Sequence, residues 1–208
     1  MHQTRQTASI KLPIPRKGTK YVARAFSHLQ DSVPVVIAVR DMLHLAHTAK
    51  EVKNMIKERD LKINWRPVKD LRESIKLFNI FEADKTYKLT LLPTGKFAFK
   101  ELNKKEDRLC KVIDKRLVKK GAIQLNLHDG SNILTNQKNI ATGDSVYLGP
   151  KGEIIGHIPI EKGREVFIIS GKHKGRIGRI ESIENRKVKV KYDGSEAFLD
   201  KKVLVIIK

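Results

Sequence analysis

The sequence predicts an α+β protein in which a small helical module is followed by two β-rich regions. Apolar residues recur at near-helical spacing within residues 34–82. From residue 83 onward, short apolar runs alternate with turns rich in glycine, proline and aspartate, which is typical of strands. The expected organisation is a basic extended N-terminal arm (1–33), a small helical module (34–82), a central β-rich domain (83–159) and a C-terminal β-barrel (160–208).

The arm is recognised by its mixture of cations and helix-breaking residues. Residues 11–20 carry two prolines and a glycine among four cations. Apolar residues are too few there for a core, and proline favours extended backbone. We therefore expect an extended segment that clamps onto a partner, and a disordered leader is the alternative.

The helical module has two predicted helices and a short strand. The first helix follows Pro34, where apolar residues run from Val35 to Leu45. The second begins at a capping box formed by Thr48 and Glu51. The apolar face of this second helix contains Val52, Met55 and Ile56, and its opposite face contains Lys50, Lys53 and Lys57. A short strand at residues 61–63 precedes a turn at residues 64–66.

The central domain is predicted from short strands with frequent turns. Residues 87–92 and 96–99 flank Pro93-Thr94-Gly95, which indicates a hairpin. A series of short strands suggests a barrel or a small sandwich. The further candidate strands are residues 109–113, 122–127, 133–134, 146–148 and 153–158.

The C-terminal region repeats this pattern on a smaller scale. About fifty residues with four or five strands suggest an SH3-like barrel. The candidate strands are residues 165–169, 179–183, 187–192 and 203–207.

The charge of the chain narrows the class of partner. The formal net charge is +20, and each of the four segments is basic on balance. Such an excess implies a polyanion. No apolar run approaches the roughly 18 residues that a membrane span needs, and residues 1–9 do not form a signal peptide. The single cysteine excludes an internal disulfide and a cysteine-based zinc site. A cytoplasmic protein that binds nucleic acid is therefore expected.

The sharpest motif lies at residues 162–180, which read Lys-Gly-Arg-Glu-Val-Phe-Ile-Ile-Ser-Gly-Lys-His-Lys-Gly-Arg-Ile-Gly-Arg-Ile. It resembles a KOW motif, except that Arg164 stands where that motif usually has aspartate. Glycines at 171, 175 and 178 allow positive φ and close approach of the backbone to a ligand. An ordinary barrel turn with solvated charges is the alternative to RNA contact.

The helical module also resembles a known RNA-binding unit. Residues 39–56 are similar to the small RNA-binding domain shared by several ribosomal proteins, pseudouridine synthases and aminoacyl-tRNA synthetases. Arg59 and Trp65 occupy positions where that domain usually has glycine in its turns. Trp65 is then either a core residue or a platform for base stacking.

A third set of residues indicates the family. Arg108–Ile113, Lys119–Ile133 and Thr142–Asp144 resemble, in that order, the central domain of S4e ribosomal proteins of archaea and eukaryotes. The order of the modules matches as well, over roughly residues 10–208. The resemblance implies a structural constituent of the small ribosomal subunit that binds rRNA and neighbouring ribosomal proteins. It implies no enzyme activity, cofactor, membrane or small-molecule substrate.

The remaining chemically reactive residues do not form a catalytic or metal-binding pattern. His128 and Asp129 at a glycine turn are interpreted as a turn with an Asx hydrogen bond, and Cys110 as a buried core residue. The histidines show no metal-ligand spacing. A pseudouridine synthase needs a larger catalytic domain than the central stretch provides. A KOW-type transcription elongation factor needs a polymerase-binding domain, and none is visible.

The predicted RNA contacts are cationic residues of the arm, the helical module, the central domain and the KOW loop. The glycines of that loop are predicted to be critical for the backbone of the turn. The cationic set is Lys11, Arg16, Lys17, Lys20, Arg40, Lys50, Lys53, Lys57, Lys62, Arg66, Lys115, Arg116, Lys119, Lys120, Lys172, His173, Lys174, Arg176 and Arg179, and the glycines are Gly171, Gly175 and Gly178.

Overall fold

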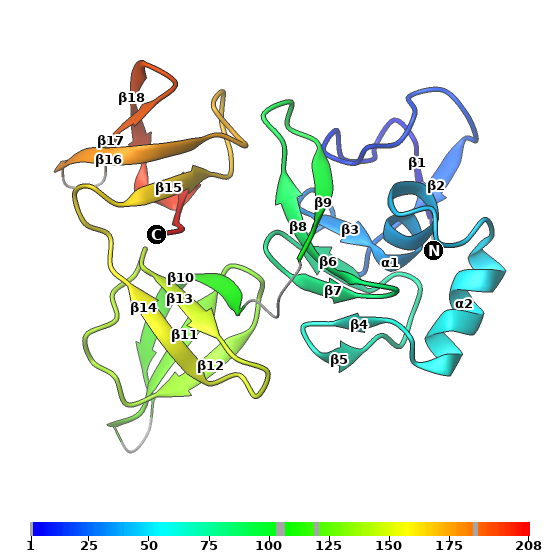
Figure 1. The fold of residues 1–208 in the computed structure, drawn as a ribbon, viewed down its shortest axis with the longest axis horizontal. Coiled ribbons are helices and arrows are strands. Elements are labelled where there is room, and N and C mark those ends of the chain that lie inside the picture. The colour runs from blue at the N-terminus through cyan, green and yellow to red at the C-terminus, as the bar shows by residue number, and fades with distance from the viewer. Residues whose placement is uncertain (1, 103–106, 119–120, 185–186) are drawn as a thin grey trace. The chain divides into compact units, whose positions relative to one another are not determined.

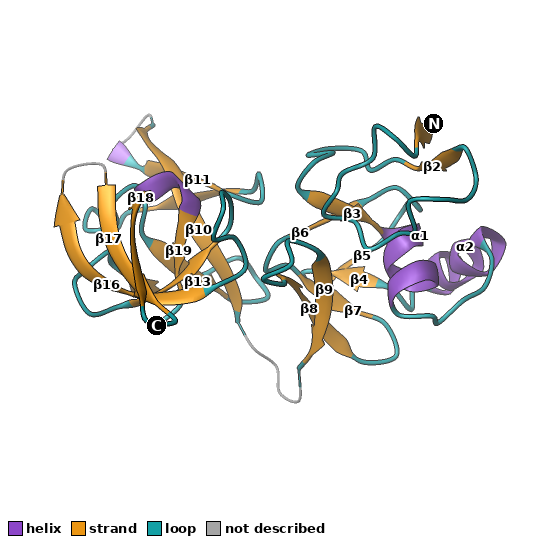
Figure 2. Ribbon diagram, turned by 90° about the horizontal axis from the view of Figure 1, so that it is seen from above, coloured by secondary structure: helices purple, strands orange, loops and turns teal. Residues whose placement is uncertain are grey.

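The structure is a computed structural model that describes residues 2–102, 107–118, 121–184 and 187–208. The chain divides into two compact units, Met1–Glu106 and Asp107–Lys208. Strands dominate both units and the helices are few and short (Figures 1 and 2). The fold is therefore mostly β, which corrects the balance implied by the predicted α+β class. Within the described residues, no helix has both the length and the apolar character to cross a membrane.

A five-stranded antiparallel sheet of order β5-β4-β7-β8-β9 organises the first unit. The predicted hairpin is present, and Gly95 in its turn has φ 78°. Strand β8 also pairs with β7, through Tyr87 opposite Phe81. The hairpin therefore belongs to the first compact unit of the structure. The strands are β4 (Lys62–Ile63), β5 (Arg66–Pro67), β7 (Ile80–Glu82), β8 (Thr86–Leu91) and β9 (Phe97–Glu101).

Two helical segments lie beside each other at one side of this unit (Figure 2). Strand β3 (Ser32–Pro34) pairs with β6 (Ser74–Lys76) and leads directly into α1 (Val35–Ile37). The first predicted helix is present as α1, which continues directly into a π-helical turn, η1 (Ala38–Met42).

Helix α2 (Ala49–Glu58) begins at the predicted capping box. The Thr48 hydroxyl accepts a hydrogen bond from the Glu51 backbone N–H at 3.2 Å. The Glu51 carboxylate accepts another from the His47 backbone N–H at 2.8 Å, and this bond lowers the pKa of Glu51. Val52 is buried and the three lysines of the opposite face are exposed, as the helical spacing predicted.

The turns of this module adopt positive φ, which glycine favours, at positions that hold other residues. Arg59 ends α2 in the left-handed region with φ 64°. Asn64 and Trp65 connect β4 to β5 with φ 49° and 64°. Positive φ at both central residues is the geometry of a type I′ hairpin turn. Trp65 is partly buried.

The N-terminal segment is folded onto the first unit, which differs from the predicted extended arm. Strand β1 (His2–Thr4) pairs with β2 (Tyr21–Ala23). Leu12 is only 1 % exposed, and its neighbour Lys11 accepts a backbone hydrogen bond from Phe97 at 2.8 Å. One buried leucine and main-chain hydrogen bonds thus hold a segment whose composition alone did not predict a packed structure.

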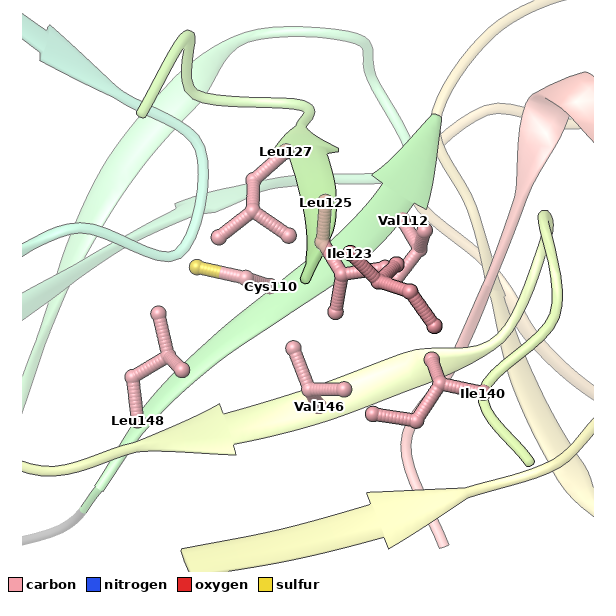
Figure 3. Close-up of a cluster of buried hydrophobic side chains, with 8 residues drawn as sticks. All are labelled: Cys110, Val112, Ile123, Leu125, Leu127, Ile140, Val146 and Leu148. Carbon is pink, nitrogen blue, oxygen red and sulfur yellow. The ribbon is translucent and has the colours of Figure 1, made fainter. Parts of the chain in front are cut away.

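The second unit contains a five-stranded sheet of order β12-β11-β10-β13-β14. Every strand predicted between residues 109 and 158 is present, and β10 is longer than expected. Side chains from one face of this sheet form a core that includes Cys110, Leu125 and Val146 (Figure 3). The strands are β10 (Arg108–Leu117), β11 (Ile123–Leu127), β12 (Asn132–Thr135), β13 (Ser145–Leu148) and β14 (Ile154–Ile158).

A second five-stranded sheet, β18-β17-β16-β15-β19, completes this unit. Four of its strands were predicted, and β18 was missed. The Asp193-Gly194 turn before β18 is a recognised hairpin signal that would have found it. The strands are β15 (Glu165–Ile168), β16 (Ile177–Glu184), β17 (Lys187–Tyr192), β18 (Ser195–Asp200) and β19 (Leu204–Ile206), with a 3-10 turn η3 (Lys201–Val203) before β19.

A buried lysine joins the two sheets of the second unit. Lys111 on β10 is 4 % exposed. Its ammonium donates to the backbone carbonyls of Lys201, Lys202 and Leu204 at 2.6, 2.8 and 2.7 Å. Burial lowers its pKa to about 8, against the opposing attraction of Asp200. Tyr147 and Ser145 on β13 add hydrogen bonds to the backbone of Ile207 and Ile206.

Candidate nucleic-acid interface

A groove of about 1080 Å³ opens in the first unit. Its walls come from the N-terminal segment, from η1 and the loop after it, from helix α2, and from the loop before β6. The N-terminal segment reaches this position because β1 and β2 pair and because Arg5 is fixed. The Arg5 guanidinium donates to the carbonyls of Thr19 and Pro15 at 2.8 and 2.5 Å. The groove is therefore a product of tertiary folding.

Cationic side chains from all four walls line this groove. Arg40 donates to both carboxylate oxygens of Asp41 at 2.8 Å, and this pairing raises the pKa of Arg40. Arg72 is paired with Asp70 at 3.2 Å. The sequence predicted three of these cations and missed the others, which become neighbours only on folding. The predicted cations are Arg40, Lys53 and Lys57, and the missed ones are Arg5, Lys69 and Arg72.

The KOW loop of the second unit is the other basic surface. Gly171 and Gly175 have φ 88° and 79°, so the turn requires glycine at both positions. Gly178 is needed for a different reason than predicted. An added Cβ there would lie 2.5 Å from the Val190 side chain and 2.8 Å from the Lys191 carbonyl oxygen. Gly178 thus allows β16 to pack closely on β17.

The side chains of this loop are held by Tyr192. The Tyr192 hydroxyl and His173 Nδ1 are 2.8 Å apart, and the two ring centroids are 4.8 Å apart. The Arg176 guanidinium lies 5.5 Å from the Tyr192 ring centroid and pairs with Asp193 at 3.3 Å. Lys172 is exposed and Lys174 is half-buried. Two of the predicted loop residues, His173 and Arg176, are therefore held by contacts with Tyr192.

The remaining predicted residues are mostly paired within the protein. Lys11 forms an ion pair with Asp31, Lys62 with Glu82, Arg66 with Glu73, Arg116 with Asp114 and Arg179 with Glu165. Lys115 donates to the carbonyls of Lys138 and Ile140. Arg16, Lys17, Lys20 and Lys50 are exposed, and Lys119 and Lys120 lie outside the described residues.

Asp129 and Cys110 are held by contacts within the protein. Asp129 accepts from the Ser131 backbone N–H at 2.9 Å, which confirms the predicted Asx turn, and it also forms an ion pair with Arg108. Cys110 is buried as predicted, and burial raises the pKa of its thiol to about 12. Across the described ranges, no group of three or more histidine, cysteine or acidic side chains could hold a metal ion.

These features define a mostly β, strongly basic protein with a cation-lined groove in one unit and a KOW-like loop in the other. The sequence profile of Ribosomal family S4e matches residues 83–154, and that of the KOW motif matches residues 162–193. The chain is 37 % identical to the small ribosomal subunit protein eS4 of Methanospirillum hungatei over 178 residues, which cover 80 % of this chain and 73 % of that protein. The match to the eS4 protein of Archaeoglobus fulgidus is 34 % identical and covers 88 % and 80 %.

A solved structure has the same fold. The crystal structure of the 30S ribosomal protein S4e from Thermoplasma acidophilum aligns with a TM-score of 0.73 at 22 % identity, over 85 % of this chain and 95 % of that one. The sequence matches and this shared fold agree. The chain belongs to the S4e family of ribosomal proteins.

Proposed function

We propose that this protein is a structural constituent of the small ribosomal subunit, where it binds rRNA and supports translation. The observation that carries the proposal is its sequence similarity to eS4 proteins over most of its length. The net charge of +20 gives that similarity a physical basis, because phosphate neutralisation needs a large cationic excess.

The contribution of each region follows from its chemistry. The groove of the first unit and the KOW loop supply the main phosphate contacts, and the C-terminal sheet is an SH3-like barrel that holds the loop. The protein acts without catalysis, on the ribosome in the cytoplasm, beside other small-subunit proteins. The KOW-like elongation factor and the RNA-modifying enzyme are the competing functions that an experiment has to separate from this one.

Sedimentation tests the proposal directly. A tagged full-length chain, expressed in an archaeal host, is expected to sediment with small ribosomal subunits and to be released only as salt is raised. Sedimentation with RNA polymerase would favour the elongation factor. Conversion of uridine to pseudouridine in transcribed rRNA by the purified chain would favour the enzyme.

A further inference from the structure

The groove of the first unit retains unpaired positive charge. Among the described residues, no carboxylate forms an ion pair with Lys53, Lys57 or Lys69. Arg5 donates only to carbonyl and hydroxyl oxygens, so its charge is also not neutralised by an acid. Charge gathered in a concave, low-dielectric site attracts anions more strongly than the same charge on a flat surface.

The same groove has apolar walls beneath these cations. Ile14, Ile56 and Leu71 line it and are half-buried, and Val36 lines it with 5 % of its surface exposed. A site for phosphate alone does not need an apolar wall. A ligand that carries both phosphates and flat, weakly polar surfaces satisfies both parts of the groove, and a nucleotide is such a ligand.

An exposed aromatic ring completes the wall. Tyr21 lines the groove and is 47 % exposed. Its backbone is fixed by pairing with Thr4, and its ring is 4.2 Å from the His2 ring centroid. The Lys20 ammonium lies 5.4 Å from the same ring. A held aromatic ring beside cations is the arrangement on which unstacked bases are bound in single-stranded RNA.

We propose that this groove holds single-stranded rRNA, with phosphates on Arg5, Lys53, Lys57 and Lys69 and at least one unstacked base against Tyr21. In a duplex the faces of the bases are covered by their neighbours, so the apolar wall and the tyrosine would have no base to contact. This inference rests on the proposed function and adds the class of RNA that the groove takes.

Binding of two defined RNAs tests the base contact. The probes are a labelled oligouridine decamer and a blunt, GC-rich RNA duplex of about ten base pairs, at the same ionic strength. The Tyr21→Leu variant should bind the decamer roughly five- to a hundredfold more weakly, because stacking is lost while apolar bulk remains. Its affinity for the duplex should stay within about twofold. Phe198→Leu is the matched control, because Phe198 is 55 % exposed on β18 in the other unit.

Salt titrations test the phosphate contacts. The Lys53→Ala/Lys57→Ala variant should lower the slope of log affinity against log salt for the decamer by about 1.4, at about 0.7 per phosphate contact. The control Lys85→Ala/Lys100→Ala removes two exposed lysines of the first unit that neither line the groove nor belong to the predicted RNA contacts. This control should leave the slope unchanged.

Crosslinking of the unmodified chain gives a reading that no folding defect can affect. A decamer that carries 4-thiouridine should crosslink to peptides that contain Tyr21 or residues 44–57. Crosslinks confined to the KOW loop, or equal losses of decamer and duplex binding in Tyr21→Leu, would overturn the inference. The proposed function would survive either result if the chain still sediments with small subunits, and it fails separately if the chain does not.

Discussion

The two basic surfaces of this protein differ in how some of their cations are held. In the KOW loop, Arg176 is paired with Asp193 and rests on Tyr192, which also holds His173. In the groove of the first unit, Lys53 and Lys57 project from a rigid helix, and the described residues offer them no acidic partner. The contrast is one of degree, because Arg40 and Arg72 of the groove are also paired with aspartates and Lys172 of the loop is exposed. A protein that neutralises phosphate needs both kinds of cation, because charge draws RNA in and shape fixes its position.

The lysines of this protein also differ in burial and in hydrogen bonding. Lys111 is buried, and its ammonium donates hydrogen bonds to three backbone carbonyls within the protein. The lysines of α2 are exposed. A large net charge thus does not by itself show how many cations are available for RNA. Pairing and burial in the folded chain decide that number.

The largest expected effect comes from disrupting the close packing of β16 on β17 at Gly178. Gly178→Val should lower the free energy of unfolding of the second unit by about 3 kcal/mol, because its Cβ would lie against Val190 and the Lys191 carbonyl. The single tryptophan, Trp65, reports the first unit, so its fluorescence transition in denaturant should not move while the circular dichroism transition does.

Gly156→Ala is the matched control for that variant. The nearest atom to its added Cβ would be a Tyr147 ring carbon at 3.4 Å, which is close to an ordinary contact. Gly156→Ala should lower the free energy of unfolding of the second unit by less than about 1 kcal/mol. Equal losses for the two variants would show that tight packing at Gly178 is not what the sheet requires.

Gly175→Val separates shape from charge at the loop. Gly175 has φ 79°, a region that valine adopts only with strain of about 1–3 kcal/mol. Affinity for a small-subunit rRNA fragment should fall while the salt slope stays the same, since no cation is lost. Lys53→Ala/Lys57→Ala should also weaken binding, but it should flatten the slope because two cations are lost. A flattened slope for Gly175→Val would remove the distinction between the two surfaces.

Lys111 should make the stability of the second unit depend on pH. Burial lowers its pKa from 10.5 to about 8, so above pH 8 the folded state releases a proton that the unfolded state keeps. The free energy of unfolding should therefore rise by about 1 kcal/mol between pH 8 and 9.

The buried thiol opposes this trend, weakly between pH 8 and 9 and more strongly above pH 9. Burial raises the pKa of Cys110 from 9.0 to about 12, so the unfolded state loses that proton first and unfolding is favoured as pH rises. Denaturant titrations at pH 8 and 9 measure the rise, and Lys111→Met should abolish it. If Lys111→Met shows the same rise as the natural sequence, another group is responsible.

The smallest expected effect is a gain in stability in the first unit. Arg59 ends α2 with φ 64°, and Arg59→Gly should relieve that strain and raise the free energy of unfolding by about 0.5–1 kcal/mol. Trp65 fluorescence in denaturant measures it. Glu58→Gly changes the residue one position earlier, inside the helix. It should instead lower the free energy of unfolding of the first unit by about 1 kcal/mol.

Local chemistry made much of the fold predictable from the sequence. The capping box at Thr48, the Pro93-Thr94-Gly95 turn and the alternating strands after Leu109 depend on residues only a few positions apart. The turn residues of the KOW loop were predictable for the same reason. The missed strand β18 followed an Asp-Gly signal that was present in the sequence.

The sequence by itself thus determined the capped helix α2, most of the strands from β8 onward, the family, and the positions of the cations on α2 and in the KOW loop. Only the tertiary structure brought Arg5 into the groove that α2 lines, buried Leu12, and buried Lys111 against the backbone carbonyls of Lys201, Lys202 and Leu204. These contacts join residues far apart in the chain, and they depend on hydrogen bonds and burial that no short window of sequence contains. Periodicity records which face of an element is apolar, but the partner of that face is fixed only when the whole chain folds.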